Sequence, residues 1–453
     1  MDKKEFNSRL LKLVVPITMQ QLMLAAVSFT DALMVGFISQ DALSAVSLAG
    51  QVQFIFSLFI FSVTGGVSIL AAQYWGILDK DSVEKTLGIG MKLLTLFSLP
   101  FTVGALACPE LIMKCFASDP VLIEIGAGYL RAVAPSYLML AVSQNCLCIM
   151  KNCGRAVECS VISSASVVLN ILFNWLLIFG VGPFPQLGAV GAAVATVISK
   201  AVELVWALIA TSRKDGVRLR LKWCVHNDRA LRRDYFKYSL PVLANNLVWG
   251  LGFSMYSVIL GHLGSDAAAA NAIANIIKNL AICVCEGVSS AAAVLVGSLL
   301  GQGLLDKARE YGSRLCKAAM ISGAASGVIV LLVIPFVPLF GSLTDTAQHY
   351  LRIMLIVSSY YVFGKSINMT VISGIFPSGG DSTFGLKCDT VTMWAVTVPL
   401  GLIAAFVLKL PPIVVYVMIN IDEIIKLPAV YRHYKKYCWL HNLTNTKPEA
   451  LSA

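Results

Sequence analysis

Residues 13–38 read LVVPITMQQLMLAAVSFTDALMVGFI, and Asp31 is the one ionisable side chain among them. A helix of this length crosses a hydrocarbon core of roughly 30 Å. Because no water reaches that core, the backbone of a spanning segment must satisfy its own hydrogen bonds, which favours an α-helix. The stretch therefore predicts a transmembrane helix. The residues before it are charged and lack a small-residue cleavage site, so we expect the helix to be retained.

Similar apolar stretches recur along the whole chain of 453 residues. Hydrophobic residues make up 57% of the chain and charged residues only 13%, and the mean hydropathy is +0.77. A soluble domain of this length needs more charge to cover its surface. We predict an all-α integral membrane protein with twelve transmembrane helices, near residues 13–38, 46–76, 87–108, 127–150, 157–181, 187–210, 238–261, 270–300, 313–340, 350–376, 384–408 and 411–432.

Lysine and arginine residues gather on one side of these predicted spans. Nine of them follow span six, whereas only Lys114 and Lys409 lie clearly within the loops of the opposite side. By the positive-inside rule both termini are cytoplasmic, and the even number of spans agrees. The formal net charge of +10 then faces anionic lipid headgroups, so it predicts a membrane partner and no nucleic-acid partner.

The chain also contains an internal repeat. A shift of 225 residues superposes residues of the same type in the same order, among them Pro16 on Pro241, Gly36 on Gly261, Asp41 on Asp266 and Gly76 on Gly301. Each half has six predicted spans and enters the membrane from the same side, which predicts two parallel, pseudo-symmetric six-helix lobes. Two such lobes around a central cleft are typical of a transporter that rocks between two states.

The repeat sets the predicted domains, which are an N-terminal lobe at 1–210, a basic cytoplasmic linker at 211–237, a C-terminal lobe at 238–436 and a cytoplasmic tail at 437–453. In the linker, leucine and aromatic residues stand between cations, a pattern that suits a helix on the membrane surface. A solvated basic loop fits the first part of the linker equally well.

Ionisable residues in the middle of a span are costly, which makes each one a candidate functional residue. Asp31 lies about a turn and a half before the outer end of span one, fifteen residues after Pro16, where the helix can bend. Its carboxylate can exchange a proton or bind a cation. The alternative is a structural carboxyl held by hydrogen bonds. The repeat places Tyr256 at the equivalent position, so the halves differ chemically there.

Glu286, in the middle of span eight, is a second candidate, although Lys278 lies two helical turns away and offers a structural ion pair. Residues three or four apart share a helix face and can pair with one another. Three further groups are typical of such pairs or of helix ends: Lys200 with Glu203, Lys426 with Asp422 and Glu423, and Asp389.

Uncharged polar residues also occur where lipid would exclude them. Asn170 and Asn174 lie four residues apart and hence on one face of span five, where they can ligate a cation, bind a substrate or join two helices. Aromatic rings can stack on a planar cationic substrate. The candidates for lining a substrate cavity are Gln21, Tyr137, Asn245, Trp249, Tyr256 and Glu286.

Four stretches together resemble the multidrug and toxic compound extrusion (MATE) transporters, in particular their bacterial branch similar to the DNA-damage-inducible protein F, in the MOP flippase superfamily. They are P-x14-D-ALMVG-x4-DALSAVSLA from Pro16, SLPVLANNLVWGLGFSMYSVILGHLGSDAAAANAIA from Ser239, LNILFNWLLIFG with PQLGAVGAAVATVIS from Leu169, and SGGDSTFGLKCDTVTMW from Ser378. The resemblance implies a V-shaped, twelve-helix monomer in the bacterial cytoplasmic membrane. Such a protein exports cationic amphiphiles in exchange for inward-moving H⁺ or Na⁺.

The resemblance also implies a coupling site. The acidic residue of the family's first helix corresponds to Asp31, the polar pair of its fifth helix to Asn170 and Asn174, and the threonine of its sixth helix to Thr196. The family has an aspartate where this chain has Asn174, and often an acid in helix seven, where this chain has asparagines such as Asn245. Asp31 is then the main titratable group of the N-terminal lobe. A bound Na⁺ would lie at Asp31, Asn170 and Asn174, and no other cofactor is implied.

Other functions fit the residues less well. A flippase for lipid-linked saccharides, from the same superfamily, would need Arg or Lys around a pyrophosphate, but the mid-membrane cations are few, namely Lys278, Lys200 and Lys365. An enzyme is not favoured, because the five histidines lie in or near loops and no span contains HExxH, GxSxG or a carboxylate dyad. A structural or receptor role would leave the repeat and Asp31 unexplained.

Overall fold

The computed structural model describes residues 3–213, 217, 218, 220, 222, 223, 229–339 and 343–444, with the backbone alone for Lys3, Ser28, Phe29, Ala32 and Leu339. Within these residues all regular secondary structure is helical and no strand occurs. Ten of the helices in this part of the chain are long and apolar enough to cross a membrane, judged by length and composition. The predicted all-α membrane fold is confirmed.

The first half of the chain forms long helices with one short helix between them. They are α1 (Lys3–Gly36), α2 (Gln40–Gly76), α3 (Lys80–Ala107), α4 (Pro109–Lys114), α5 (Pro120–Asn152), α6 (Ala156–Phe179) and α7 (Gly188–Thr211). Local signals set where they begin. The side chains of Asp79 and Asp119 accept hydrogen bonds from backbone N–H groups of the following turn, at 3.1 and 2.9 Å, and so cap α3 and α5.

The second half is more irregular. It comprises α9 (Arg229–Gly261), α10 (Ser265–Gly301), α11 (Leu305–Leu332), η1 (Ile334–Leu339), α12 (Asp345–Asn368), η2 (Met369–Ile375), α13 (Phe376–Ser378), α14 (Thr383–Asp389), η3 (Thr390–Thr397), α15 (Val398–Leu402), η4 (Ile403–Val407), α16 (Pro412–Ile419) and α17 (Asp422–Lys435). The segments η2, η3 and η4 are π-helical. Wider turns of this kind occur often at functional sites.

Two predicted spans are interrupted or polar in the structure. Span ten, at 350–376, is formed by α12 together with η2, and span twelve, at 411–432, by α16 and α17, which meet at Asn420. Neither reaches the length and apolar content of the other ten, because α12 carries many polar residues and α16 has only 8 residues.

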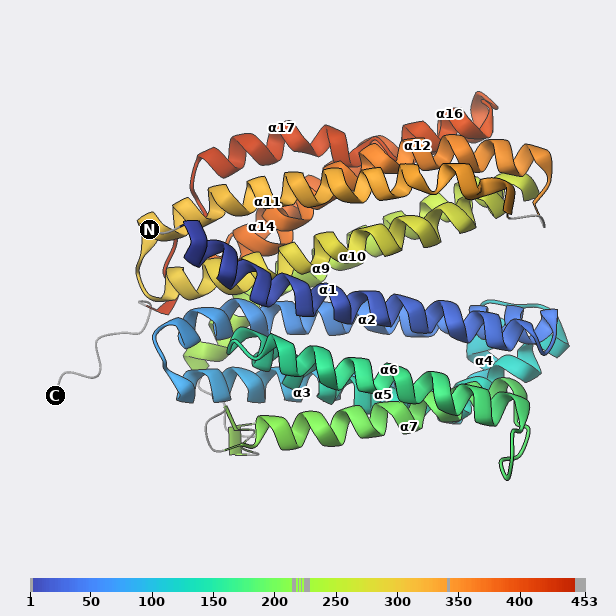
Figure 1. The fold of residues 1–453 in the computed structure, drawn as a ribbon, viewed down its shortest axis with the longest axis horizontal. Coiled ribbons are helices and arrows are strands. Elements are labelled where there is room, and N and C mark those ends of the chain that lie inside the picture. Colours follow the sequence, from blue (N-terminus) through green and yellow to red (C-terminus); the bar gives the residue numbers. More distant parts are fainter. Residues whose placement is uncertain are drawn as a thin grey trace. The chain divides into compact units, whose positions relative to one another are not determined.

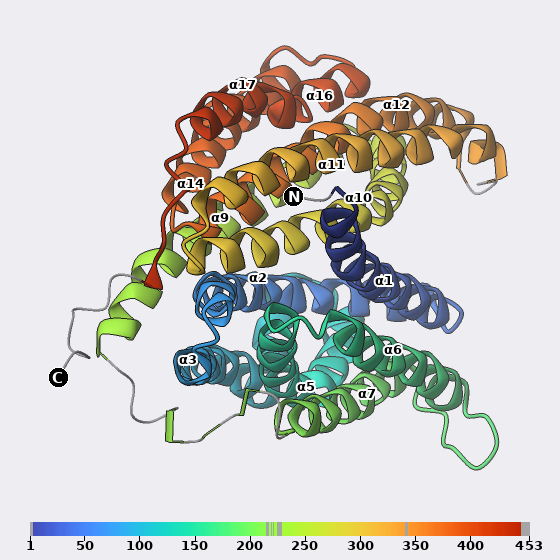
Figure 2. The same ribbon diagram turned by 60° about the vertical axis from the view of Figure 1, so that its left-hand side comes forward.

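The chain forms two compact units. The N-terminal unit comprises 22–71 and 79–236, and the C-terminal unit comprises the residues up to Gln21, 72–78 and those from Lys237 onward. In the N-terminal unit α3, α5, α6 and α7 pack side by side, and in the C-terminal unit α10, α11 and α12 do so (Figures 1 and 2). The first part of α1 thus packs with C-terminal helices, a feature that the repeat does not indicate. The predicted domain boundaries stay a prediction.

The second part of the predicted linker is the beginning of a long helix. Residues from Arg229 belong to α9, and the Tyr235 hydroxyl donates to the Val63 carbonyl at 2.9 Å. The first part lies largely outside the described residues. Where it is described, Trp223 lies against Gly88 of α3, and Arg220 pairs with Glu84 at 2.8 Å. These contacts anchor the linker on α3.

Candidate functional site

A chain of hydrogen bonds joins the four predicted coupling residues in the N-terminal unit. The Asn174 amide donates to the Asp31 carboxylate and, at 3.2 Å, to Asn170 Oδ1. The Asn170 amide donates in turn to Thr196 Oγ1 at 3.3 Å. Helices α1, α6 and α7 therefore bring Asp31, Asn174, Asn170 and Thr196 together, as the sequence predicts. Their role stays a prediction.

Ser199 belongs to the same network, although the sequence analysis did not single it out. Its hydroxyl lies 3.5 Å from the Asn170 amide nitrogen. It follows Thr196 by three residues and so shares its face of α7. That spacing is the signal by which it could have been found.

Close packing of α6 against α7 brings the side chains of this network within hydrogen-bond distance of one another. A Cβ atom at Gly191 of α7 would lie only 2.6 Å from the Leu177 carbonyl oxygen of α6, so the helices approach here because the residue is glycine. At the end of α6, Gly180 adopts a φ of +69°, which glycine accepts without strain. Its turn sends the chain back toward α7.

Asp31 differs from a carboxylate that serves structure alone. Among the described residues it accepts a hydrogen bond from Asn174 and forms no ion pair. Glu203, which is only 1% exposed, instead pairs with Lys200 at 2.7 Å and accepts hydrogen bonds from Ser143 at 3.0 Å and Gln144 at 3.3 Å. The predicted Lys200–Glu203 pair is confirmed. Lys200 therefore has Glu203, and not Asp31, as its ion-pair partner. Asp31 therefore keeps lone pairs for a further ligand.

A second oxygen beside Asp31 also lacks a partner. Asn174 is fully buried, and its Oδ1 forms no hydrogen bond within the described residues. A buried carbonyl oxygen without a donor is costly. Carboxylate and amide oxygens are hard ligands, so Asp31, Asn174 and Asn170 suit Na⁺ or a proton better than a soft metal. Within the described part of the chain, no group of three or more His, Cys, Asp or Glu residues is arranged so that it could hold a metal ion.

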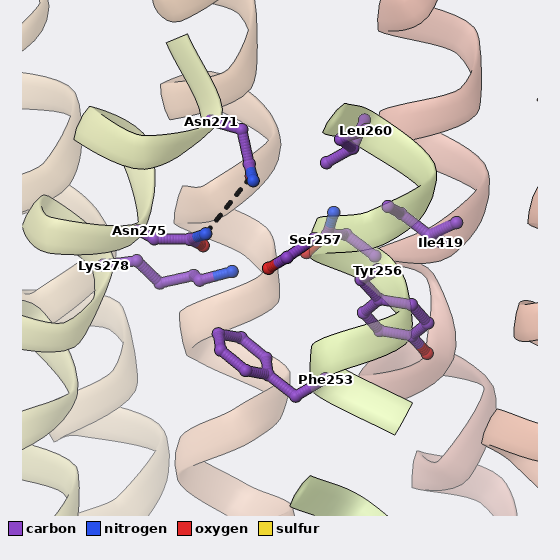
Figure 3. Close-up of a pocket in the computed structure, with 9 residues that line it drawn as sticks. Phe253, Tyr256, Ser257, Leu260, Asn271, Asn275, Lys278 and Ile419 are labelled. Atoms are coloured by element: carbon purple, nitrogen blue, oxygen red, sulfur yellow. Dashed lines mark hydrogen bonds between the residues drawn. The ribbon is translucent and has the colours of Figure 1, made fainter. Parts of the chain in front are cut away.

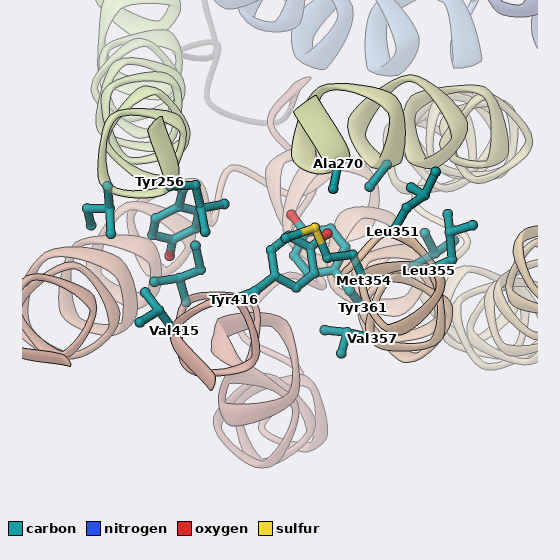
Figure 4. Close-up of a cluster of buried hydrophobic side chains, with 14 of the residues drawn as sticks. Tyr256, Ala270, Leu351, Met354, Leu355, Val357, Tyr361, Val415 and Tyr416 are labelled. Carbon is teal, nitrogen blue, oxygen red and sulfur yellow. The ribbon is translucent and has the colours of Figure 1, made fainter. Parts of the chain in front are cut away.

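The equivalent position of the C-terminal unit carries a neutral pair. The Tyr256 hydroxyl lies 2.5 Å from Thr397 Oγ1 of the π-helical η3. Figure 3 shows this hydroxyl directed away from Lys278, and the ring packs in the apolar core with Met354 and Tyr416 (Figure 4). The two units are therefore chemically unequal at the position that the repeat aligns.

The other cavity candidates are distributed over both units. In the C-terminal unit Gln21 donates to Glu286, Trp249 stacks on Phe253 with ring centroids 5.6 Å apart, and Asn245 has a buried Oδ1 without a partner in the described residues. In the N-terminal unit Tyr137 is only 1% exposed and packs edge-on against a neighbouring ring in the core.

Glu286 and Lys278 do not form the ion pair that their spacing allows. Glu286 takes the Gln21 amide as a partner, and the Lys278 ammonium lies over two aromatic rings, 4.6 Å from the centroid of Tyr361 and 5.6 Å from that of Phe253. Two helical turns separate their backbones, and the aromatic faces hold Lys278 elsewhere.

A buried ion network joins α12, α14 and α17 in the C-terminal unit. Lys426, which is 1% exposed, lies 2.7 Å from Asp389, 3.2 Å from Glu423 and 3.3 Å from Asp422. Lys365 adds a second cation, 3.2 Å from Glu423. The predicted pairing of Lys426 with Asp422 and Glu423 is confirmed. Asp389, predicted as a helix-end residue, is part of the same network.

Comparison with known proteins places this arrangement in a group of transporters. The model of the MatE family matches residues 16–176 and 241–403, one match in each half. The chain is 22% identical over 415 residues to the uncharacterized transporter YisQ of Bacillus subtilis (strain 168), covering 90% of each protein. It is 22% identical over 404 residues to the probable multidrug resistance protein NorM of Haemophilus ducreyi, covering 88% of this chain and 87% of the relative.

The fold agrees with that of solved structures. An outward-facing multidrug resistance MATE family transporter of the MOP superfamily superposes with a TM-score of 0.85 at 18% identity, covering 94% of this chain and 95% of the other.

Proposed function

Since the chain belongs to the MatE family of membrane transporters, we propose that it is a secondary active multidrug exporter that releases cationic or amphiphilic small molecules in exchange for inward H⁺ or Na⁺. The observation that carries the proposal is Asp31, a half-buried carboxylate with a single described hydrogen-bond donor, next to the unpaired Asn174 Oδ1. Relatives that bear the names NorM and multidrug resistance protein support the substrate class.

In this mechanism Asp31 holds the coupling ion. A proton would bind one oxygen of the Asp31 carboxylate, whereas Na⁺ would be held by Asp31 and the amide oxygens of Asn174 and Asn170. Binding removes the negative charge from within the span, where an uncompensated charge is costly. Coupling then requires that the ion and the drug differ in their affinity for the two states of the transporter.

The remaining features of the proposal follow the charge pattern of the chain. A basic linker and few basic residues on the opposite side support cytoplasmic termini in a bacterial cytoplasmic membrane. We take the transporter to act as a monomer. A flippase for anionic pyrophosphates is not favoured, because two of the three mid-membrane lysines, Lys200 and Lys365, are paired with glutamates. Lys278 alone is a weak basis for binding a pyrophosphate.

The test is export of a fluorescent organic cation, rhodamine 123, from proteoliposomes with an imposed ΔpH or ΔpNa. We expect one of the two gradients to drive export by the wild type, and Asp31→Asn to reduce it to background. Asp41→Asn, the same change at an exposed carboxylate at the beginning of α2, is the matched control and should keep gradient-driven export. Unchanged export by Asp31→Asn would overturn the coupling role.

A further inference from the structure

The end of α2 belongs to the C-terminal unit, although the rest of that helix belongs to the N-terminal unit. Residues 72–78 pack with the C-terminal helices, and the chain on both sides of them is N-terminal. The helix is unbroken from Gln40 to Gly76, so rocking of the N-terminal unit pulls on the segment 72–78. The contacts that hold this segment therefore act on the change of state.

The segment crosses the end of α10 at two glycines. A Cβ atom at Gly76 would collide with the Ser298 backbone of α10, and one at Gly301 would collide with the backbone of Gln73. The repeat aligns Gly76 with Gly301 and Gln73 with Ser298. The two helix ends therefore contact each other in the same way from both sides, at a separation that only glycine allows.

Gln73 binds the segment to the last described residues of the chain. Its side chain is fully buried, and its Nε2 donates to the Ser378 carbonyl at 2.6 Å and to the His441 carbonyl at 3.3 Å. Its Oε1 accepts from the Leu443 N–H at 2.6 Å. Both polar atoms of this side chain are thus bound to backbone of the C-terminal unit. Releasing them is costly, because a buried group that loses its partner does not regain water.

Residues 437–444, which we call the latch, follow α17 and pack into the C-terminal unit. Trp439 is fully buried in an apolar core that it shares with side chains of α10 and α11. The Asn442 amide donates to the Gly301 carbonyl at 3.1 Å. The latch thus binds α2 through Gln73 and α10 through Gly301. Since it follows the last helix, it can leave both without unfolding a helix.

We propose that the latch holds the end of α2 on α10 and must release it before the transporter can open on the side where basic residues gather. The inference rests on the part of the proposed function in which the two units alternate between two states. A contact that stabilises one of two states sets the population of the other. Weakening the latch should therefore shift the protein toward the state that is open to the cytoplasm.

Hydrogen–deuterium exchange of the purified full-length protein in detergent tests the latch without substrate or gradient. Gln73→Met keeps the size of the side chain but removes the partner of the Leu443 N–H and of the Ser378 carbonyl. Amide exchange reports local opening. We expect exchange in 72–78 and 297–301 to become about tenfold faster, the effect of losing these buried hydrogen bonds.

The outer ends of α1 and α9 distinguish a shift of state from a general loosening. Exchange around Gly36 and Gly261, which the repeat aligns, should become slower in Gln73→Met, because one side of a rocking transporter closes as the other opens. Gln302→Met is the matched control. Gln302 is exposed directly after α10, and its bond to Ser298 Oγ is long, at 3.4 Å, so both exchange rates should stay as in the wild type.

Asn442→Ala weakens the latch at its other contact, and it decides alone if Gln73→Met does not fold. It loses the bond to the Gly301 carbonyl, so we expect changes in the same directions but of about threefold, the effect of one hydrogen bond. Unchanged exchange in the variants overturns the latch. So does faster exchange at the inner and outer ends alike, or an equal effect of Gln302→Met.

Export of rhodamine 123 by the wild type separates failure of the latch from failure of the proposed function. A wild type that exports the dye, with variants that lack the opposite changes at the inner and outer ends, refutes the latch alone. A wild type that does not export the dye, with variants that show these opposite changes, refutes export of organic cations and leaves the latch standing.

Discussion

At the scale of single residues, Asn174 determines how Asp31 holds its ion. Asn174→Ala removes the described hydrogen-bond donor to the carboxylate as well as the unpaired Oδ1. A hydrogen bond to a charged group contributes about 1.5–3 kcal/mol. Without this donor the carboxylate binds a proton more readily, so proton-driven export should reach half-maximum at a pH higher by about one unit. Sodium-driven export should instead need about tenfold more Na⁺.

The variant should bind a proton more tightly but Na⁺ more weakly than the wild type. It therefore identifies the coupling ion without relying on a loss of activity. Half-maximal pH and half-maximal Na⁺ concentration are measured for wild type and Asn174→Ala in the same proteoliposomes. A variant that shifts neither value would show that Asn174 does not contact the ion-binding carboxylate during transport.

Lys426 is a residue on which stability depends. It lies within 3.3 Å of Asp389, Glu423 and Asp422, all of them buried. Lys426→Met leaves these carboxylates without their shared cation, and breaking a buried pair costs about 3–5 kcal/mol. We expect a large fall in the thermal unfolding midpoint and in the yield of monodisperse protein.

Arg9→Met supplies the comparison for this prediction. Arg9 pairs with Glu5 at 2.8 Å, but both side chains are about half exposed, and such pairs contribute less than about 1 kcal/mol. The thermal unfolding midpoint of Arg9→Met should stay close to that of the wild type. A Lys426→Met variant as stable as Arg9→Met would show that the network is dispensable.

At the scale of elements, the approach of α6 to α7 controls the coupling site. The Cβ of Gly191→Ala would meet the Leu177 carbonyl oxygen at 2.6 Å, so the helices must separate. Overpacking of this kind costs about 1–3 kcal/mol, and separation also lengthens the Asn170–Thr196 contact. We expect a lower unfolding midpoint together with weaker gradient-driven export.

Gly50→Ala in α2 is the matched substitution. Nothing lies within 4 Å of its Cβ position, so the greater helix propensity of alanine, about 1 kcal/mol, should raise the midpoint. Both midpoints are obtained from thermal unfolding in detergent. Equal shifts in the two variants would contradict the close approach of α6 and α7.

At the scale of the whole molecule, the native cysteines report the orientation in the membrane. Cys115 follows α4 on the side with few basic residues, Cys438 follows α17 on the basic side, and both are exposed. With the termini in the cytoplasm, a membrane-impermeant maleimide should label a single-cysteine variant retaining Cys115 in intact cells. The variant retaining Cys438 should react only after permeabilisation. The reverse pattern would invert the assigned orientation.

The sequence predicts the helices and the grouping of the polar residues around Asp31 well, for a physical reason. Apolar stretches report burial in lipid directly, and Asn170 and Asn174 show their common face by their spacing. The ion network around Asp389 and Lys365 could not be assembled in this manner, because its members are distant in the chain and no periodicity relates them. The π-helical turns of η3, which contain Thr397, could not be predicted from the sequence either, because they depend on packing between helices.

The ionisable groups buried in the two units have a consequence for the membrane voltage. In the C-terminal unit three lysines (Lys278, Lys365, Lys426) stand with four carboxylates (Glu286, Asp389, Asp422, Glu423), so one negative charge remains. In the N-terminal unit Lys200 cancels Glu203, and Asp31 remains. An electric field acts on net charge, with about 2.3 kcal/mol per elementary charge at 100 mV. The unloaded protein therefore carries one such charge in each unit, and its sensitivity to the membrane potential should fall, but not disappear, when Asp31 binds its ion.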